Sequence, residues 1–149
     1  MKLERWQNKV ALVTGASSGI GRSIAIELAQ SGMRVVGCAR RLDRLESLQD
    51  EIGHDRFMPI ETDLRDERSI LSMFEHIRST WGGVDVLINN AGLGHKTSLM
   101  DGNTEQWSEM LDVNVLALCI CTREAITDMR KRGDDGHIIH ISSMSAHRV

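Results

Sequence analysis

Short apolar runs alternate along the chain with segments in which apolar residues recur every three or four positions. The runs cover residues 9–14, 34–39, 56–61, 84–89 and 137–142. The segments with the longer spacing cover residues 19–30, 41–52, 66–80 and 104–131. Short continuous runs favour buried strands, whereas a three-to-four spacing is typical of amphipathic helices. The pattern therefore predicts five strands with one helix between each consecutive pair.

Glycines and a proline fall where these predicted elements should end. Gly32, Gly53 and Gly82 each follow a predicted helix, in the position where glycine commonly terminates helices. Pro59 lies in the third predicted strand and has no N–H to donate, which favours an edge position. Strands alternating with helices predict an α/β fold, a doubly wound parallel sheet (Rossmann-like). Right-handed crossovers favour the strand order 3-2-1-4-5.

Composition and charge exclude several classes of protein. The 149 residues fit one domain, with 41% hydrophobic and 26% charged residues, as in soluble globular proteins. A net charge of −3 gives no reason to expect a nucleic-acid partner. The longest apolar stretch, residues 115–121, is far shorter than the roughly 20 residues of a spanning helix, and no secretory signal is visible. We therefore expect a cytoplasmic protein with neither a nucleic-acid nor a membrane partner.

The cysteines and histidines do not form a recognisable metal site. Three cysteines, Cys38, Cys119 and Cys121, are too few for a disulfide framework, which indicates a reducing compartment. Cys119 and Cys121 are two positions apart on a predicted helix and therefore point in different directions. We predict no metal, and we expect the three thiols to be small packing residues.

A glycine-rich segment joins the first predicted strand to the first predicted helix. Residues 14–21 read TGASSGIG, and their glycines permit a close approach of the backbone to a ligand. The helix that begins there offers unpaired N–H groups and the positive end of its dipole. A merely tight turn is the alternative. The strand–loop–helix context nevertheless favours a pyrophosphate site for a dinucleotide.

The end of the second predicted strand bears on the choice of nicotinamide cofactor. An NAD site usually has an acidic residue about 20 positions beyond the glycine loop, where it accepts from the ribose 2′-hydroxyl. Here that position is Ala39, and Arg40 and Arg41 follow. A guanidinium group can bind a 2′-phosphate, which a carboxylate would repel. We therefore predict NADP, although both arginines could instead simply solvate the start of the second helix.

The spacing G-x-x-x-G-x-G resembles the short-chain dehydrogenase/reductase family, of the classical type. Further motifs support the resemblance over residues 4–149: NNAG at 89–92, the pair Asp63-Leu64, Asn114, and ISS at 141–143. Residues 36–40 and 115–118 resemble the ketosteroid- and farnesol-type members in particular. The resemblance implies an NADP-dependent oxidoreductase that interconverts an alcohol and a carbonyl by hydride transfer.

The resemblance also assigns residues to roles. The cofactor-binding residues it implies, together with the glycine loop and the two arginines, are Gly15, Ser17, Ser18, Gly19, Ile20, Gly21, Arg40, Arg41, Asp63, Leu64, Asn90, Ala91 and Gly92. Asp63 resembles the family residue that accepts from the adenine amino group, and a helix N-cap is its alternative role. Loop residues 93–100 are expected to contribute one wall of the substrate pocket.

Two residues resemble catalytic positions of the family. Ser143 resembles the serine that hydrogen-bonds the substrate oxygen, with Ser142 as the alternative if the register is one residue different. Asn114 resembles the asparagine that holds a water in a proton relay. Asn114 also falls within a predicted apolar stripe, where a buried amide needs hydrogen bonds, so a purely structural role is the alternative. The stripe consists of Trp107, Leu111, Leu118, Cys121 and Ala125.

One expected part of the family's machinery does not occur in the sequence. The family's acid/base is the tyrosine of a Tyr-x-x-x-Lys motif beyond the serine, and this chain contains no tyrosine. We therefore expect residues 1–149 to be the NADP-binding Rossmann domain of a longer enzyme and inactive alone. The complete protein would be a homo-oligomer (dimer or tetramer) that acts on a small molecule. The alternative is a non-catalytic nucleotide-binding or interaction module.

Overall fold

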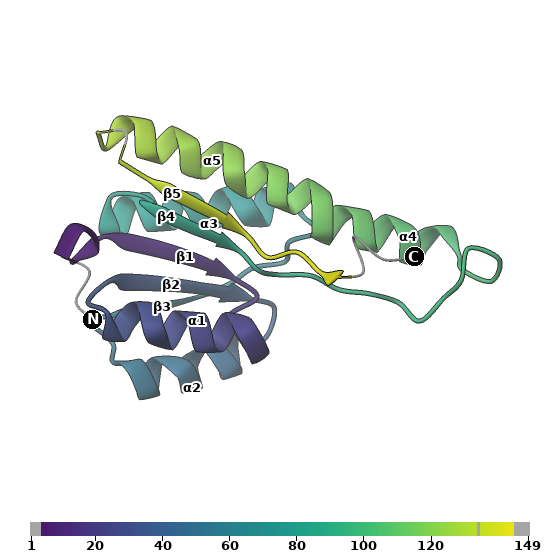
Figure 1. Cartoon of the computed structure of the whole chain (residues 1–149), viewed down its shortest axis with the longest axis horizontal. Helices are drawn as coiled ribbons and strands as arrows, with labels where there is room; N and C mark the ends of the chain where they lie inside the picture. Colours follow the sequence, from purple (N-terminus) through teal and green to yellow (C-terminus); the bar gives the residue numbers. More distant parts are fainter. Residues whose placement is uncertain (1–3, 134, 145–149) are drawn as a thin grey trace.

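The computed structural model describes residues 4–133 and 135–144 of the chain (Figure 1). A short 3-10 turn, η1 (Glu4–Trp6), comes first. The strands are β1 (Val10–Thr14), β2 (Arg34–Ala39), β3 (Phe57–Glu61), β4 (Val86–Asn89) and β5 (His137–His140). The helices are α1 (Gly19–Gln30), α2 (Leu42–Ile52), α3 (Glu67–Trp81), α4 (Thr104–Leu111) and α5 (Ala117–Lys131), with a π-helical turn, η2 (Asp112–Leu116), between the last two.

The five strands form one parallel sheet in the order β3-β2-β1-β4-β5, which confirms the predicted doubly wound topology. Strand β1 lies at the centre, where Val13 is in register with Gly37 of β2 and with Ile88 of β4. Strand β3, which carries Pro59, is at an edge as predicted. The carboxyl ends of all five strands therefore lie on one side of the sheet.

Helices cover both faces of this sheet, α1 and α2 on one face and α3 and α5 on the other (Figure 1). Strand β1 is buried along its whole length, and its side chains alternate between the two layers. Val13 belongs to the core layer that contains Leu45 of α2, whereas Leu12 belongs to the layer that contains Phe74 of α3 and Ile120 of α5. Burying a large apolar side chain contributes about 1.5–3 kcal/mol, so these two layers hold the strand ends in place.

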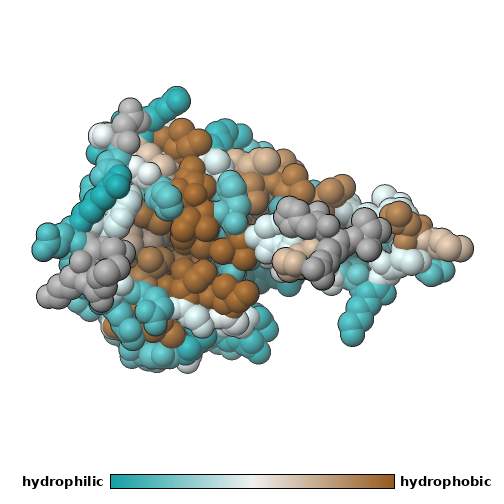
Figure 2. Space-filling model, viewed as in Figure 1, coloured by the Kyte–Doolittle hydropathy of each residue, from teal (hydrophilic) through white to brown (hydrophobic). Residues whose placement is uncertain are grey.

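The sheet is less well covered toward β5. Among the described strands β5 forms the second edge, and Ile139 is 39% exposed. Figure 2 shows apolar residues gathered in the middle of the visible face, where β4 and β5 run beside α5 in Figure 1. An exposed edge with apolar side chains is a surface on which another strand can pair.

The helix predicted over residues 104–131 has the expected extent but is not continuous. The turn η2 interrupts it, and a π-turn changes the direction in which the following residues face. The predicted single stripe is therefore broken: Cys121 and Ala125 are buried, but Leu111 is 61% exposed. Helix α4 extends beyond the sheet together with the loop that precedes it (Figure 1).

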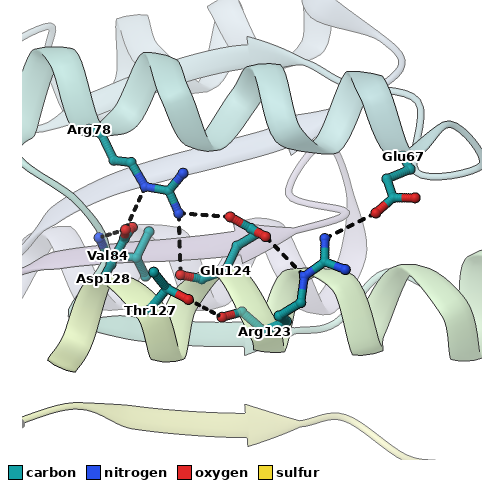
Figure 3. Close-up of polar contacts among 7 residues, drawn as sticks. All are labelled: Glu67, Arg78, Val84, Arg123, Glu124, Thr127 and Asp128. Carbon is teal, nitrogen blue, oxygen red and sulfur yellow. Dashed lines mark hydrogen bonds and ion pairs between the residues drawn. The ribbon is translucent and has the colours of Figure 1, made fainter. Parts of the chain in front are cut away.

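Buried carboxylates tie α5 to the amino ends of the central strands. Asp128 of α5 accepts from Nε of Arg78 in α3 at 2.6 Å and from the backbone N–H of Val84 at 3.1 Å (Figure 3). Asp85 accepts a bidentate pair from Arg132 at 2.8 and 2.9 Å, and also the N–H of Val10. Because both carboxylates are almost fully buried and fully bonded, they fix α5 relative to β1 and β4.

Only two of the three cysteine side chains are buried as packing residues, as the sequence predicted for all three. Cys38 and Cys121 are buried as predicted, and burial raises the pKa of the Cys121 thiol to about 12, so it stays protonated at neutral pH. Cys119 is exposed, because it lies two positions from Cys121 on the opposite side of α5. It is therefore not the packing residue that was expected. No helix within residues 4–133 and 135–144 is long and apolar enough to cross a bilayer.

The burial of the Asp128 carboxylate leads to a prediction about stability. Replacing Asp128 by alanine leaves the N–H of Val84 and part of the Arg78 guanidinium without a partner, and should lower the free energy of unfolding by about 3 kcal/mol. The exposed pair between Arg123 and Glu67 in the same region (Figure 3) is the control, and Glu67→Ala should cost less than about 1 kcal/mol. Urea unfolding measures both values. Equal losses would show that burial does not set the strength of these pairs.

Candidate functional site

A cavity of about 840 Å³ opens at the carboxyl ends of β1 to β4. Its walls come from the loop after each strand and from the turn η2. The lining residues are Gly15, Ser17, Ser18, Gly19, Ile20, Ala39, Arg40, Arg41, Thr62, Asp63, Leu64, Arg65, Asn90, Ala91, Gly92, Leu93 and Val113. All the sequence-predicted cofactor residues except Gly21 are in this set. Ligand pockets typically measure about 300–1,000 Å³, so the cavity can accommodate a dinucleotide.

The glycine loop after β1 is held against β2. The backbone N–H groups of Gly15 and Ala16 both donate to the carbonyl oxygen of Cys38, at 2.9 and 3.2 Å. Gly15 has φ of +68°, in the left-handed region that favours glycine. A Cβ there would lie 3.0 Å from Cα of Ala91. The loop therefore approaches the end of β4 as closely as its backbone allows.

Gly21 packs against the glycine loop and does not line the cavity. It lies in the first turn of α1 and is buried. A Cβ at this position would meet Nδ2 of Asn90 at 2.4 Å and the carbonyl oxygen of Gly15 at 2.5 Å. Glycine is thus required because α1, the loop and the end of β4 converge at this point.

The first turn of α1 directs positive potential into the cavity. Ser18, Gly19 and Ile20 line it, and Ser18 is the N-cap residue but makes no side-chain capping hydrogen bond. No acidic residue occurs in that first turn, whose residues are all described. The N–H groups and dipole of a helix N-terminus attract anions. This arrangement can bind an anion such as a phosphate group.

Thr14 and Asn90 join the ends of the two central strands. The Thr14 hydroxyl accepts from the backbone N–H groups of Asn90 and Ala91, each at 3.0 Å. The Asn90 amide donates to the carbonyl oxygens of Thr14, at 2.9 Å, and Gly15, at 3.4 Å. These bonds position both the glycine loop and the segment after β4. Sequence reasoning did not select Thr14, although a hydroxyl residue directly before the glycine loop was a usable signal.

Two guanidinium groups line the cavity at the end of β2. Arg40 and Arg41 follow Ala39, and Nη2 of Arg41 is 3.4 Å from the Ser17 hydroxyl. Neither arginine forms an ion pair with another described residue. Because Ala39 has no carboxylate, nothing at this position repels a phosphate group. The predicted pattern at the end of the second strand therefore does face the predicted ligand space.

Among the described residues of the cavity wall Asp63 is the one that is acidic, and it is paired. Both its oxygens accept from the Arg65 side chain, and its Oδ1 also accepts from the Arg65 backbone N–H. The hydrogen bonds from Arg65 lower the pKa of Asp63 to about 2, so the carboxylate is ionised at neutral pH. The alternative role considered for Asp63 is wrong: the N-cap of α3 is Asp66, which accepts from the N–H of Arg68.

The two predicted catalytic residues lie outside the cavity lining. Asn114 is in η2 and is exposed, not a buried amide of an apolar stripe as considered from the sequence. Its side chain accepts from the N–H of Leu93 at 2.9 Å and donates to the carbonyl oxygen of Leu93 at 2.8 Å. Asn114 thus holds the loop after β4. Ser143 is exposed beyond the end of β5.

Comparison with known proteins adds the decisive observation. The family model described as short chain dehydrogenase matches residues 9–149. The chain belongs to this family. Among the similar short-chain dehydrogenases, the human protein named dehydrogenase/reductase SDR family member 11 is 52% identical over 99% of this chain and 58% of its own length. The farnesol dehydrogenase of Aedes aegypti is 44% identical over 99% of this chain and 62% of its own.

Solved short-chain dehydrogenases share the fold. The L-sorbose reductase from Gluconobacter frateurii, in complex with NADPH and L-sorbose, matches with a TM-score of 0.89 and 35% identity, over 94% of this chain and 54% of that one. A short-chain dehydrogenase/reductase from Mycobacterium marinum matches with a TM-score of 0.91 and 32% identity, over 97% and 57%. The chain therefore spans about three-fifths of the length of the curated relatives that it matches.

The convergence of backbone at Gly21 can be tested directly. Gly21→Ala should force the loop and Asn90 apart and lower the free energy of unfolding by about 1–3 kcal/mol, the usual cost of overpacking. Gly94 is the matched control, because a Cβ there meets nothing within 4 Å. Gly94→Ala should change stability by less than about 0.5 kcal/mol. Urea unfolding of both variants measures the difference, and a Gly21→Ala protein as stable as the native one would contradict the packing described here.

Proposed function

We propose that this short-chain dehydrogenase binds NADP(H) and forms the cofactor-binding part of an oxidoreductase that interconverts an alcohol and a carbonyl. The observation that carries the proposal is the joint presence of the glycine loop, the uncapped start of α1 and two arginines around one cavity. The bound cofactor would supply the hydride, while the protein supplies position and electrostatics. The NADPH in the similar L-sorbose reductase supports the same choice of cofactor.

The residues of the cavity fit the parts of such a cofactor. The glycine loop and the first turn of α1 would hold the pyrophosphate, since they present backbone N–H groups to the cavity. Arg40 and Arg41 would bind the 2′-phosphate, and Ala39 leaves that position free of negative charge. Asp63 and the N–H of Leu64 would bind the adenine. We assign the nicotinamide side to residues 90–92.

We further assign catalytic roles to two residues on the basis of the family resemblance. Ser143 would hydrogen-bond the oxygen of a small alcohol or carbonyl substrate, and Asn114 would hold a water for proton transfer. The hydrogen bonds of Asn114 to Leu93 place it beside the cavity wall, because Leu93 lines the cavity. We place the enzyme in the cytoplasm and propose that it is a homo-oligomer.

A second candidate function is a nucleotide-binding module without catalysis. The observation that favours it is the absence of tyrosine from all 149 residues, because the acid/base of the family is a tyrosine. Reading the transcript downstream of codon 149 distinguishes the two functions. A continued reading frame with Tyr-x-x-x-Lys supports the oxidoreductase, whereas a stop codon in the mature transcript supports the binding module.

Cofactor preference follows from the two arginines. The chain should bind NADPH at least about 10-fold more tightly than NADH, because one charge-assisted phosphate contact is worth about 1.5–3 kcal/mol. Arg40→Ala and Arg41→Ala should each reduce this preference, while Arg44→Ala, in the helix α2 that follows them but outside the cavity, should leave it unchanged. Fluorescence titration or calorimetry gives the dissociation constants. A native preference for NADH would refute the assignment.

The absence of tyrosine also predicts the activity of the isolated chain. Residues 1–149 should bind NADPH without oxidising or reducing any alcohol or ketone, since no described group replaces a phenol near pKa 10 that is tuned for proton transfer. Absorbance at the reduced nicotinamide band follows turnover against a panel of small carbonyl compounds. Steady turnover by the purified chain, abolished by Ser143→Ala, would show that the acid/base is present after all.

A further inference from the structure

A chain of four ionisable side chains runs from the cavity wall to the loop after β4. Nε of Arg65 donates to Oδ1 of Asp63 at 2.9 Å, and Nη2 donates to Oδ2 at 2.7 Å. The third nitrogen of the same guanidinium, Nη1, donates to Oε1 of Glu109 at 3.1 Å. The other oxygen of Glu109, Oε2, lies 2.8 Å from Nε2 of His95. Every nitrogen of the Arg65 guanidinium is therefore directed to a carboxylate.

The chain connects three segments that are distant in sequence. Arg65 lies between β3 and α3, Glu109 is in α4, and His95 is in the loop between β4 and α4. All four side chains are partly accessible to water. Ion pairs in such positions contribute little to folding. Their fork-like geometry instead restricts orientation, which is the property that matters for Asp63.

Arg65 controls both the direction and the charge of the Asp63 carboxylate. Oδ1 accepts two hydrogen bonds, from the backbone N–H and from Nε of Arg65. Oδ2 accepts from Nη2 at 2.7 Å and from Nε at 3.2 Å, and the Nε–H is shared between the two oxygens. A carboxylate oxygen has about two acceptor positions. The longest of these bonds, from Nε to Oδ2, is the weakest, so a donor in the cavity can compete for that position on Oδ2. The same bonds keep the pKa of Asp63 far below neutrality, so this oxygen does not become a donor.

We propose that Arg65, itself oriented by Glu109 and His95, is a positioning residue that holds Asp63 as a fixed acceptor for the exocyclic amino group of the adenine. The inference rests on the proposed function, because it assumes that the cavity holds a nicotinamide dinucleotide. A direct contact of Arg65 with a phosphate is the competing arrangement. The two arrangements differ in one measurable respect, the dependence of binding on the adenine amino group.

The test compares two cofactors with the 149-residue chain. One is NADPH, and the other is reduced nicotinamide hypoxanthine dinucleotide phosphate, in which a carbonyl oxygen replaces the amino group. The native chain should bind NADPH at least about 10-fold more tightly, because the carbonyl oxygen would face the Asp63 carboxylate without a proton between them. Arg65→Met should reduce this ratio to below about 3, and Arg65→Lys, which keeps the charge but not the fork, should give an intermediate ratio.

Two further variants separate positioning from general damage. Glu109→Gln removes the charge that orients Arg65 without touching the cavity, and should lower the adenine-to-hypoxanthine ratio in the same direction as Arg65→Met. Arg68→Met removes a nearby exposed arginine that does not line the cavity and should leave the ratio at its native value. Thermal melting of each variant shows that the fold is retained. If Arg65→Met does not fold, the adenine-to-hypoxanthine ratio of Glu109→Gln decides the test instead.

The outcomes distinguish this inference from the proposed function. A native ratio near 1, or a native ratio retained in both Arg65→Met and Glu109→Gln, overturns the positioning role. An equal loss of affinity for both dinucleotides in Arg65→Met overturns it as well and identifies a phosphate contact. Equal affinity for NADH and NADPH overturns the NADP assignment alone, because the adenine ratio can then be measured with the dephosphorylated pair. A chain that binds no dinucleotide overturns both.

Discussion

The site depends on the close approach between the glycine loop after β1 and the segment after β4. Gly15 and Gly21 leave no room for a side chain against Asn90 and Ala91. The Thr14 hydroxyl and the Asn90 amide then join the two strand ends with four hydrogen bonds to the backbone. Because β1 is central in the sheet, this junction sets where α1 begins and hence where its N-terminal N–H groups point. Movement of either strand end would displace the phosphate-binding geometry.

The two ends of the sheet use charge in opposite ways. At the amino end, Asp85 and Asp128 are buried, and their arginine partners and backbone N–H groups satisfy them within the chain. At the carboxyl end, Arg40 and Arg41 line the cavity, and neither forms a close ion pair with another described residue. Buried pairs fix the geometry, whereas cations that no carboxylate contacts directly can bind an anionic ligand. One end of the sheet is thereby fixed while the other stays available for binding.

Local sequence rules account for most of the fold and for the glycine loop and the two arginines of the cavity lining, whereas Asp63, Leu64 and residues 90–92 of the lining were identified by the family resemblance. Strand runs, helix spacing and terminal glycines such as Gly82, which has a φ of +86°, predicted every strand and the first three helices within two residues. The π-turn at residues 112–116 was not predictable from spacing, since its residues suit an α-helix equally well. The exposure of Asn114 follows from that turn and was missed for the same reason. Contacts between distant segments, such as those of Arg65 with Glu109, leave no periodic signal in the sequence at all.

The contact between Arg65 and Glu109 has a consequence for the loop after β4. This loop carries His95, which is bonded to Glu109, and Leu93, which is bonded to Asn114. Helix α4 therefore fixes this loop at His95 and the turn η2 fixes it at Leu93, which lines the cavity. A ligand that hydrogen-bonds to the Asp63 carboxylate competes with Arg65 for its oxygens. Through the bond from Arg65 to Glu109 it also affects the same loop. These bonds form a contiguous path between Asp63 in the cavity wall and the loop after β4, two segments that the backbone separates by about thirty residues, and they are therefore the direct route for any coupling between them.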